Sequence, residues 1–179
     1  MKQVIHKVFW VWEFQEEERW LNEMSAKGLH LTDAGLFRYV FEEGVPGAYQ
    51  YRLELLEHFP NHPESRKYLE FMEETGAEVV SVFKRWVYFR RKAEDGAFDL
   101  YSDMDSRIAH MKRIVTLLTI LAVVEGVCVA VEFAGAFFGH VSTMPMAAVL
   151  AIFEAFLLMG LFKMKKLYKK LISERKIRE

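Results

Sequence analysis

Three glutamates lie inside the two most apolar stretches of this sequence. Glu125 and Glu132 interrupt the run from Ile114 to Gly139, and Glu154 interrupts the run from Val141 to Phe162. A carboxyl group near the centre of a bilayer costs about 2.5–3.5 kcal/mol on insertion scales, so such groups usually face protein or water. If both runs cross a membrane, these residues indicate an intramembrane polar site.

The spacing of these glutamates predicts which of them meet. With the turn centred near His140, Glu125 lies fifteen residues before it and Glu154 fourteen after it. Antiparallel helices then bring these two carboxyls to one depth, where two like charges repel strongly and at least one group should be neutral. Glu132 shares a helix face with Glu125. The alternatives are neutral carboxyls that join helices, a cation or proton site, and a contact with a basic partner group.

A second constellation is the pair His58 and His62 in "EHFPNHPE", which has glutamates on both sides. Four-residue spacing on a helix would place two imidazoles on one face, where they can hold a metal ion. Pro60 and Pro63 instead place the pair in a loop, and no second pair of matched ligands follows. We therefore expect a solvated connection, with no metal and no cofactor.

Aromatic side chains form a third candidate site. Small sheet-and-helix domains usually bury such residues in the core. The alternative is an aromatic-walled pocket for a small ligand, with an acidic side chain that receives a cation. The residues expected to line it are Trp10, Trp12, Tyr39, Tyr49, Tyr51, Trp86 and Tyr88.

Catalytic motifs are absent from the sequence. There is no G-x-S-x-G, glycine-rich phosphate loop or H-E-x-x-H, and the single Cys128 lies in an apolar run without a cytosolic histidine to activate it. We therefore predict a protein that is not an enzyme.

Charge divides the chain into an acidic and a basic part. Residues 1–110 hold 14 basic and 20 acidic side chains, and residues 111–179 hold 10 and 5. The acidic part argues against nucleic-acid binding, which needs a basic face. The basic excess flanks the apolar runs, as expected near a membrane.

The apolar runs predict a transmembrane hairpin. Each has roughly the 20 residues that a helix needs to cross about 30 Å of hydrocarbon, and the connection "GHVSTMP" is short. We expect spans at 114–139 and 141–162. Lysines and arginines flank both outer ends, which places both termini in the cytoplasm and His140 and Ser142 near the outer surface. The predicted location is the plasma membrane, as a multi-pass protein.

The cytosolic half contains a duplication with an offset of 48 residues. "WLNEMSAKGLHL" (20–31) aligns with "YLEFMEETGAEV" (68–79), and "RYVF" (38–41) with "WVYF" (86–89). Each copy, 3–47 and 48–101, has the pattern strand, helix, strand, strand. The predicted fold class is α+β, an antiparallel sheet of about six strands with two helices on one face, over residues 1–102.

Helical segments are expected on both sides of the spans. No Gly or Pro breaks "YSDMDSRIAHMKR", and Ser102 with Asp105 resembles a capping box. A helix over 103–113 that continues into 114–139 would couple the sheet domain to the hairpin. Residues 163–179 form a basic amphipathic helix, which extends the second span or docks on the domain or on anionic lipid.

The runs at Trp20–Leu31 and Trp86–Arg90 resemble the domain of unknown function 2812 family of bacterial proteins. The resemblance implies C-terminal membrane helices, genes often placed beside PadR-like regulators, and no established catalytic residues. By topology alone, the duplicated units also resemble effector-binding domains of the gyrase-inhibitor-like class, which hold ligands between their halves.

These features predict a membrane-anchored regulatory or sensory module whose cytosolic domain binds a small ligand or a protein partner. The alternative is an accessory subunit of a membrane transporter, whose intramembrane glutamates contact an ion or a partner helix. The expected partners are the lipid bilayer and, through the hairpin, a membrane protein or a second copy of the chain.

Overall fold

The computed structural model describes residues 2–101, 103–138 and 144–178. It divides the chain into two compact units, Met1–Ser106 and Arg107–Glu179. The predicted Ser102, His140 and Ser142 lie outside the described residues.

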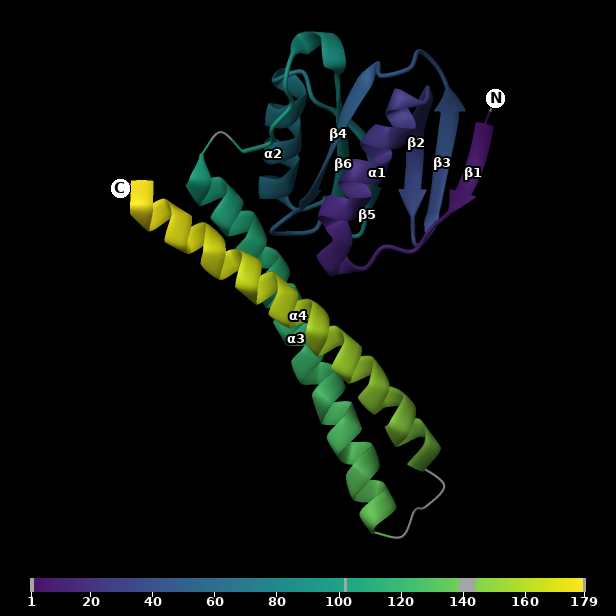
Figure 1. The fold of residues 1–179 in the computed structure, drawn as a ribbon, viewed down its shortest axis with the longest axis vertical. Helices are drawn as coiled ribbons and strands as arrows, with labels where there is room; N and C mark the ends of the chain where they lie inside the picture. Colours follow the sequence, from purple (N-terminus) through teal and green to yellow (C-terminus); the bar gives the residue numbers. More distant parts are fainter. Residues whose placement is uncertain (1, 102, 139–143, 179) are drawn as a thin grey trace. The chain divides into compact units, whose positions relative to one another are not determined.

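The first unit contains the order strand, helix, strand, strand twice (Figure 1). The first copy comprises β1 (Lys2–His6), a short 3-10 helix η1 (Val11–Glu13), α1 (Phe14–Ala26), β2 (Leu29–Gly35) and β3 (Arg38–Glu43). The second comprises β4 (Tyr49–Leu55), α2 (Pro63–Glu74), β5 (Glu78–Phe83) and β6 (Trp86–Lys92), followed by η2 (Ala93–Asp95). The predicted α+β class and its duplicated pattern are confirmed.

The six strands form two antiparallel three-stranded sheets, in the orders β1-β3-β2 and β4-β6-β5, where a single sheet of six strands was expected. Both β2 and β5 carry a register shift at the equivalent place, between Leu31 and Asp33 and between Val79 and Ser81. Such bulges bend a strand and interrupt its pairing. A side chain links the sheets here, since Ser81 Oγ accepts from the amide of Ala34 at 3.0 Å.

Helix α1 lies along the free edge of β4 and bonds its backbone through side chains. Asn22 Nδ2 donates to the carbonyl of Tyr51 at 3.1 Å, and Asn22 Oδ1 accepts from the amide of the same residue at 2.8 Å. Glu18 Oε2 accepts from the amide of Leu53 at 3.1 Å. The helix of the first copy therefore satisfies an edge strand of the second, which would otherwise be open to pairing with another chain.

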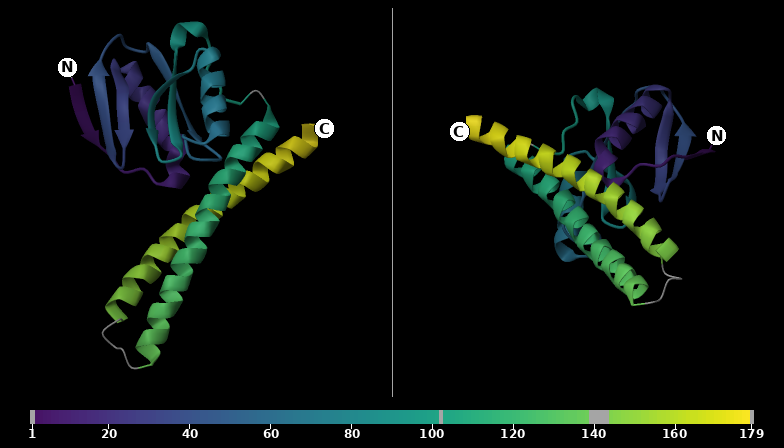
Figure 2. Two further views of the ribbon diagram at one scale, coloured as in Figure 1. Left: turned by 180° about the vertical axis from the view of Figure 1, so that it is seen from behind. Right: turned by 60° about the horizontal axis from the view of Figure 1, so that its bottom comes forward.

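The second unit consists of α3 (Met104–Phe137) and α4 (Met144–Arg178), which form a hairpin (Figure 2). By length and composition both helices can cross a membrane, and only 17% and 22% of their most apolar windows are buried. α3 is continuous through the segment expected before the first span, and α4 through the segment expected after the second. At the start of α3, the amide of Ser106 donates to Asp103 Oδ1 at 2.7 Å, as at a helix cap.

Candidate functional site

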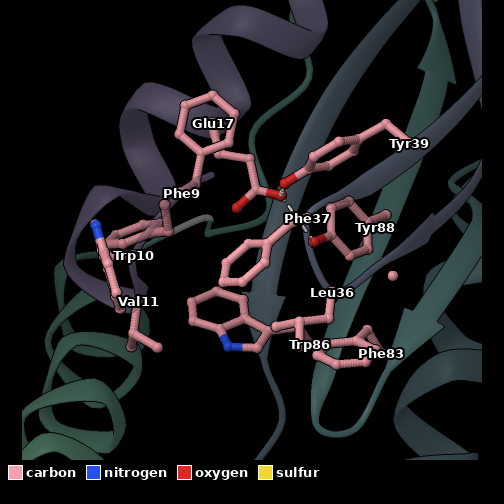
Figure 3. A pocket seen from close by; sticks show the side chains of 12 residues that line it. Phe9, Trp10, Val11, Glu17, Leu36, Phe37, Tyr39, Phe83, Trp86 and Tyr88 are labelled. Atoms are coloured by element: carbon pink, nitrogen blue, oxygen red, sulfur yellow. Dashed lines mark hydrogen bonds between the residues drawn. The ribbon is translucent and has the colours of Figure 1, made fainter. Parts of the chain in front are cut away.

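A pocket of about 110 Å³ lies where the two copies of the repeat meet (Figure 3). The first copy contributes the segment before α1, the first turns of α1, the β2–β3 turn and β3, and the second contributes the end of β5 and β6. Its lining is mostly aromatic: Phe9, Trp10, Val11, Phe14, Glu17, Gly35, Leu36, Phe37, Tyr39, Phe83, Trp86 and Tyr88. Drug-sized sites measure roughly 300–1,000 Å³, so this pocket suits a small molecule or one head group of a larger one.

Glu17 is the acidic residue of this pocket. The hydroxyl groups of Tyr39 and Tyr88, one from each copy, both donate to Glu17 Oε1 at 2.7 Å. Burial raises the pKa of the Glu17 carboxyl, and the two tyrosine hydrogen bonds oppose that rise. Burial and then the neighbouring Glu17 also raise the pKa of both tyrosines, so they remain hydrogen-bond donors at neutral pH.

The second oxygen of Glu17, Oε2, accepts no hydrogen bond from the part of the chain that the structure describes. In Figure 3 it points away from the two tyrosines, toward the aromatic wall. Glu17 as a whole is 8% exposed. The pocket therefore presents an acceptor that is held in place on one side and open on the other.

The aromatic wall beside Glu17 is itself fixed by ring packing. Trp10 stacks on Trp12 with a centroid distance of 5.6 Å and an angle of 7°, and Phe14 contacts Trp86 at 5.9 Å. Phe37, in the β2–β3 turn, has a φ of 58°, a backbone conformation that is uncommon for a bulky residue and often marks a functional site. Faces of such rings attract cations.

A family comparison covers most of this site. Residues 13–123 match the model of a family described as "Protein of unknown function (DUF2812)", which is more than half of the chain. The chain belongs to this family. No match was found among curated proteins or among solved structures, so the topological likeness to gyrase-inhibitor-like domains stays a prediction.

Four of the seven aromatic residues predicted for a ligand pocket line the cavity of this DUF2812 chain. These are Trp10, Tyr39, Trp86 and Tyr88. Trp12 is buried behind the wall, stacked on Trp10. The four residues converge only where the two copies meet, because Trp10 and Tyr39 belong to the first copy and Trp86 and Tyr88 to the second.

The other two predicted residues lie elsewhere in the first unit. Tyr51 is fully buried in the core, where its hydroxyl accepts from the amide of Leu31 at 2.9 Å. Tyr49 packs against His30, with ring centroids 5.0 Å apart, and lies under the guanidinium of Arg90 at 4.3 Å. Neither lines the pocket. Both belong to β4, whose edge α1 covers.

Glu17 was missed at the sequence level as a pocket residue. The available signal was its position: Glu17 precedes Leu21 by four residues and Met24 by seven, so it lies on the buried face of α1. A carboxyl on a buried helix face needs a partner inside the domain.

The second unit of the DUF2812 protein brings two of the three apolar-run glutamates together. The Glu154 carboxyl reaches α3 beside Gly126, where a Cβ built on that glycine would lie 3.7 Å from Glu154 Oε1. Glu125 Oε1 and Glu154 Oε2 are buried and have no hydrogen-bond partner among the described residues. Glu132 lies two turns further along α3. All three are outside the residues that match the family.

One more group of polar side chains gathers before α2. His58, His62 and Glu64 place their donor atoms within 4.8 Å of one another. Within the described chain this is the set whose donor types suit a transition-metal ion.

Proposed function

We propose that this DUF2812 protein is a membrane-anchored regulatory or sensory module whose first unit binds a small cationic ligand. The ligand's charged or hydrogen-bond-donating group would meet Glu17 in the pocket between the two copies. The observation that carries the proposal is the hydrogen bonding of the two oxygens of this carboxylate. Its Oε1 is fixed by Tyr39 and Tyr88, and its Oε2 is open toward aromatic rings.

The chemistry of the lining favours an amine, a quaternary ammonium group or a guanidinium. A buried carboxylate without a counter-charge is costly, and a bound cation would offset that cost. Aromatic faces add an attraction of about 0.5–2 kcal/mol for a cation above them. A neutral ligand of the same size without a hydrogen-bond donor would gain only the apolar contacts.

The position of the pocket supports a sensory role. A ligand there would contact the segment before α1 from one copy and the strands β5 and β6 from the other. It would therefore stabilise one arrangement of the two copies over others, which is how ligand binding shifts a conformational equilibrium. α3 starts near the end of this unit and continues without a break to Phe137, so a change could pass along a stiff helix.

Anchoring in the membrane is supported by the surface of α3 and α4. Most of their apolar windows are exposed, and such surface is unfavourable in water and favourable in hydrocarbon. The lysines that follow the second apolar run would keep the C-terminus in the cytoplasm, together with the first unit. Reporter fusions at Ser142 and Glu179 test this topology, and an external C-terminus would contradict it.

Ligand binding is tested on the full chain in detergent micelles, with thermal shift and calorimetry. The panel contains alkylamines, quaternary ammonium compounds and guanidines, each paired with a neutral isostere. We expect cations to stabilise the protein, and Glu17→Gln to weaken their binding by about tenfold or more, roughly 1.4 kcal/mol. Glu23→Gln, on the exposed face of α1, is the matched control. Equal binding to the Glu17→Gln variant, or no preference for cations, would contradict the proposal.

A second candidate function is that of an accessory subunit of a membrane transporter. The pair Glu125 and Glu154 supports it, because both have buried oxygens without a partner in the described chain. An ion, or a basic or hydroxyl group from a partner helix, would satisfy them. Glu125→Gln and Glu154→Gln are compared for transport phenotype and for co-purification of membrane partners. Unchanged results in both assays would dismiss this candidate, and loss of co-purification alone would indicate helix docking.

A further inference from the structure

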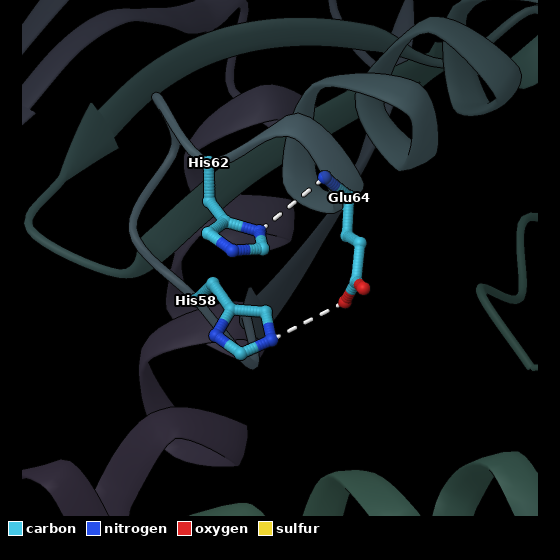
Figure 4. Close-up of side chains that lie close together, drawn as sticks. All are labelled: His58, His62 and Glu64. Atoms are coloured by element: carbon cyan, nitrogen blue, oxygen red, sulfur yellow. Dashed lines mark hydrogen bonds and ion pairs between the residues drawn. The ribbon is translucent and has the colours of Figure 1, made fainter.

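The cluster formed by His58, His62 and Glu64 lies in the connection between β4 and α2 (Figure 4). His58 Nε2 is 3.3 Å from Glu64 Oε2. The two imidazole rings stack, with centroids 4.1 Å apart and an angle of 29° between their planes. The segment is a loop, as its prolines predicted, but its three donors converge, which the four-residue spacing did not reveal.

A tight turn explains how a loop brings these side chains together. The amide of His62 donates to the carbonyl of Phe59 at 2.9 Å, and Pro60 takes the second position of this turn, where its fixed φ is favourable. The chain reverses between the two histidines. His62 then caps α2, since its Nδ1 accepts from the amide of Glu64 at 3.3 Å, and Pro63 occupies the first helical turn.

Backbone contacts hold both ends of the cluster. The hydroxyl of Ser65, which is buried, donates to the carbonyl of His58 at 3.2 Å. The amide of Arg66 donates to the carbonyl of His62 at 3.0 Å. These bonds fix the Cα positions from which the donors project, so binding an ion would require side-chain rotation and little rearrangement of the backbone.

We propose that His58, His62 and Glu64 bind a divalent transition-metal ion of the zinc type, independently of the Glu17 pocket. Two imidazoles and one carboxylate are a donor set that holds Zn²⁺ with one position left for water. Ca²⁺ and Mg²⁺ prefer oxygen ligands alone and do not match it.

The distances fit this assignment after one side chain moves. Zinc–ligand bonds of about 2.1 Å place tetrahedral donors about 3.4 Å apart, and His58 and Glu64 already stand at 3.3 Å. Stacked rings cannot both direct a lone pair at one ion, so His62 must turn. This rotation of the His62 side chain breaks its long hydrogen bond from the Glu64 amide, which is a small loss.

The surroundings allow an ion to enter and offer it negative charge. The side chains of His58 and Glu64 are 41% and 74% exposed. His58 and His62 line an open hollow of the surface, and Glu57 lines it with them. Arg85 also lines it, but its guanidinium Nε donates to the carbonyl of Leu56 at 2.8 Å and is held against the backbone. A bound ion would join the end of β4 to the start of α2.

The test uses the full chain in detergent, without a tag, stripped of metal, and with Cys128→Ser so that its thiol cannot bind the ion. Zn²⁺ is titrated by calorimetry, and Co²⁺ by its visible spectrum, which is intense for four- or five-coordinate sites and weak for the hexaaqua ion. We expect one ion per chain and a Co²⁺ spectrum of the intense type. His58→Ala, His62→Asn and Glu64→Gln should each weaken Zn²⁺ binding by about tenfold or more.

The variants are chosen to keep α2 folded. Asn is a good helix cap, so His62→Asn removes the imidazole and keeps the cap. His6→Ala, on the exposed strand β1, is the matched control and should bind like the parent. Circular dichroism of each metal-free variant verifies the fold. The proposal would be overturned if a variant with all three substitutions still bound the ion, or if His6→Ala weakened binding as much as the three single substitutions. A Co²⁺ spectrum of the hexaaqua type would overturn it as well.

Discussion

The two copies of the repeat differ in the segment that leads into their helix. At the offset of 48 residues, Trp10 and Phe14 of the first copy correspond to His58 and His62 of the second. The aromatic pair lines the pocket around Glu17, and the histidine pair lines a more open hollow before α2. The equivalent of Glu17 in the second copy is Ser65, whose hydroxyl bonds the backbone. One scaffold therefore carries two unlike candidate sites at equivalent places.

What the copies share is backbone geometry. Both helices are followed by a glycine with positive φ, 80° at Gly28 and 88° at Gly76. Both second strands carry their register shift at the same position. The side chains before the helix are under no such geometric requirement, so binding residues can differ there without changing the fold.

The glycines offer the strongest way to break the equivalence of the two copies. Gly28→Ala would place a Cβ 2.8 Å from the carbonyl oxygen of Gly44, and the nearest atom to a Cβ on Gly76 is 4.0 Å away. A left-handed alanine alone costs roughly 1–2 kcal/mol. We expect Gly76→Ala to lose about that much stability and Gly28→Ala roughly 2–4 kcal/mol. Urea unfolding of both variants in detergent measures the difference, and equal losses would show that the clash at Gly28 relaxes.

The helices provide a second comparison. Asn22 of α1 bonds both backbone groups of Tyr51, whereas its equivalent in α2, Glu70, is exposed. Asn22→Ala leaves the amide of Tyr51 unpaired, whereas the carbonyl of Tyr51 keeps its bond from the Arg52 guanidinium, so we expect a loss of roughly 1–3 kcal/mol. Glu70→Ala should stay within about 0.5 kcal/mol of the parent. The same unfolding experiment applies. A small effect of Asn22→Ala would mean that water replaces it at the strand edge.

Most of the fold follows from patterns that are local in the sequence. The offset of 48 residues and the continuous apolar runs predicted the repeat and the hairpin helices. The division into two sheets could not be predicted. Where β2 and β5 meet, the Ser81 side chain bonds the backbone of Ala34, and no periodicity in the sequence encodes that contact.

The candidate sites were predictable only in part, for a related reason. The aromatic content predicted a pocket wall, but two of the residues predicted for it, Tyr49 and Tyr51, do not line the pocket. They belong to β4, whose edge α1 covers through contacts between residues far apart in the sequence. Glu17 carried a local signal, its place on the buried helix face. His58 and His62 were assigned to a loop correctly, but the turn that closes the loop is a hydrogen bond between His62 and Phe59, not a spacing rule.

The pH dependence of stability gives the smallest and most specific test of the first copy. Because burial raises the folded-state pKa of Glu17, the folded chain holds this proton at pH values where the unfolded chain releases it. The contribution is fully present below the unfolded pKa near 4.5 and is lost as pH rises through the folded pKa.

Glu18 has a raised pKa as well, so the difference between the parent and Glu17→Gln isolates one group. We expect the parent to lose stability relative to this variant as the pH rises above about 4.5, the ordinary carboxyl pKa. Tyr39→Phe and Tyr88→Phe each remove a donor that favours the charged carboxylate. Each should therefore raise the pKa of Glu17 further and increase the loss of stability at neutral pH. Cation affinity should rise over the same pH range, because the ionised carboxylate is the form that binds. Ser65→Ala in the second copy should leave the pH profile unchanged, since no carboxyl stands at that place.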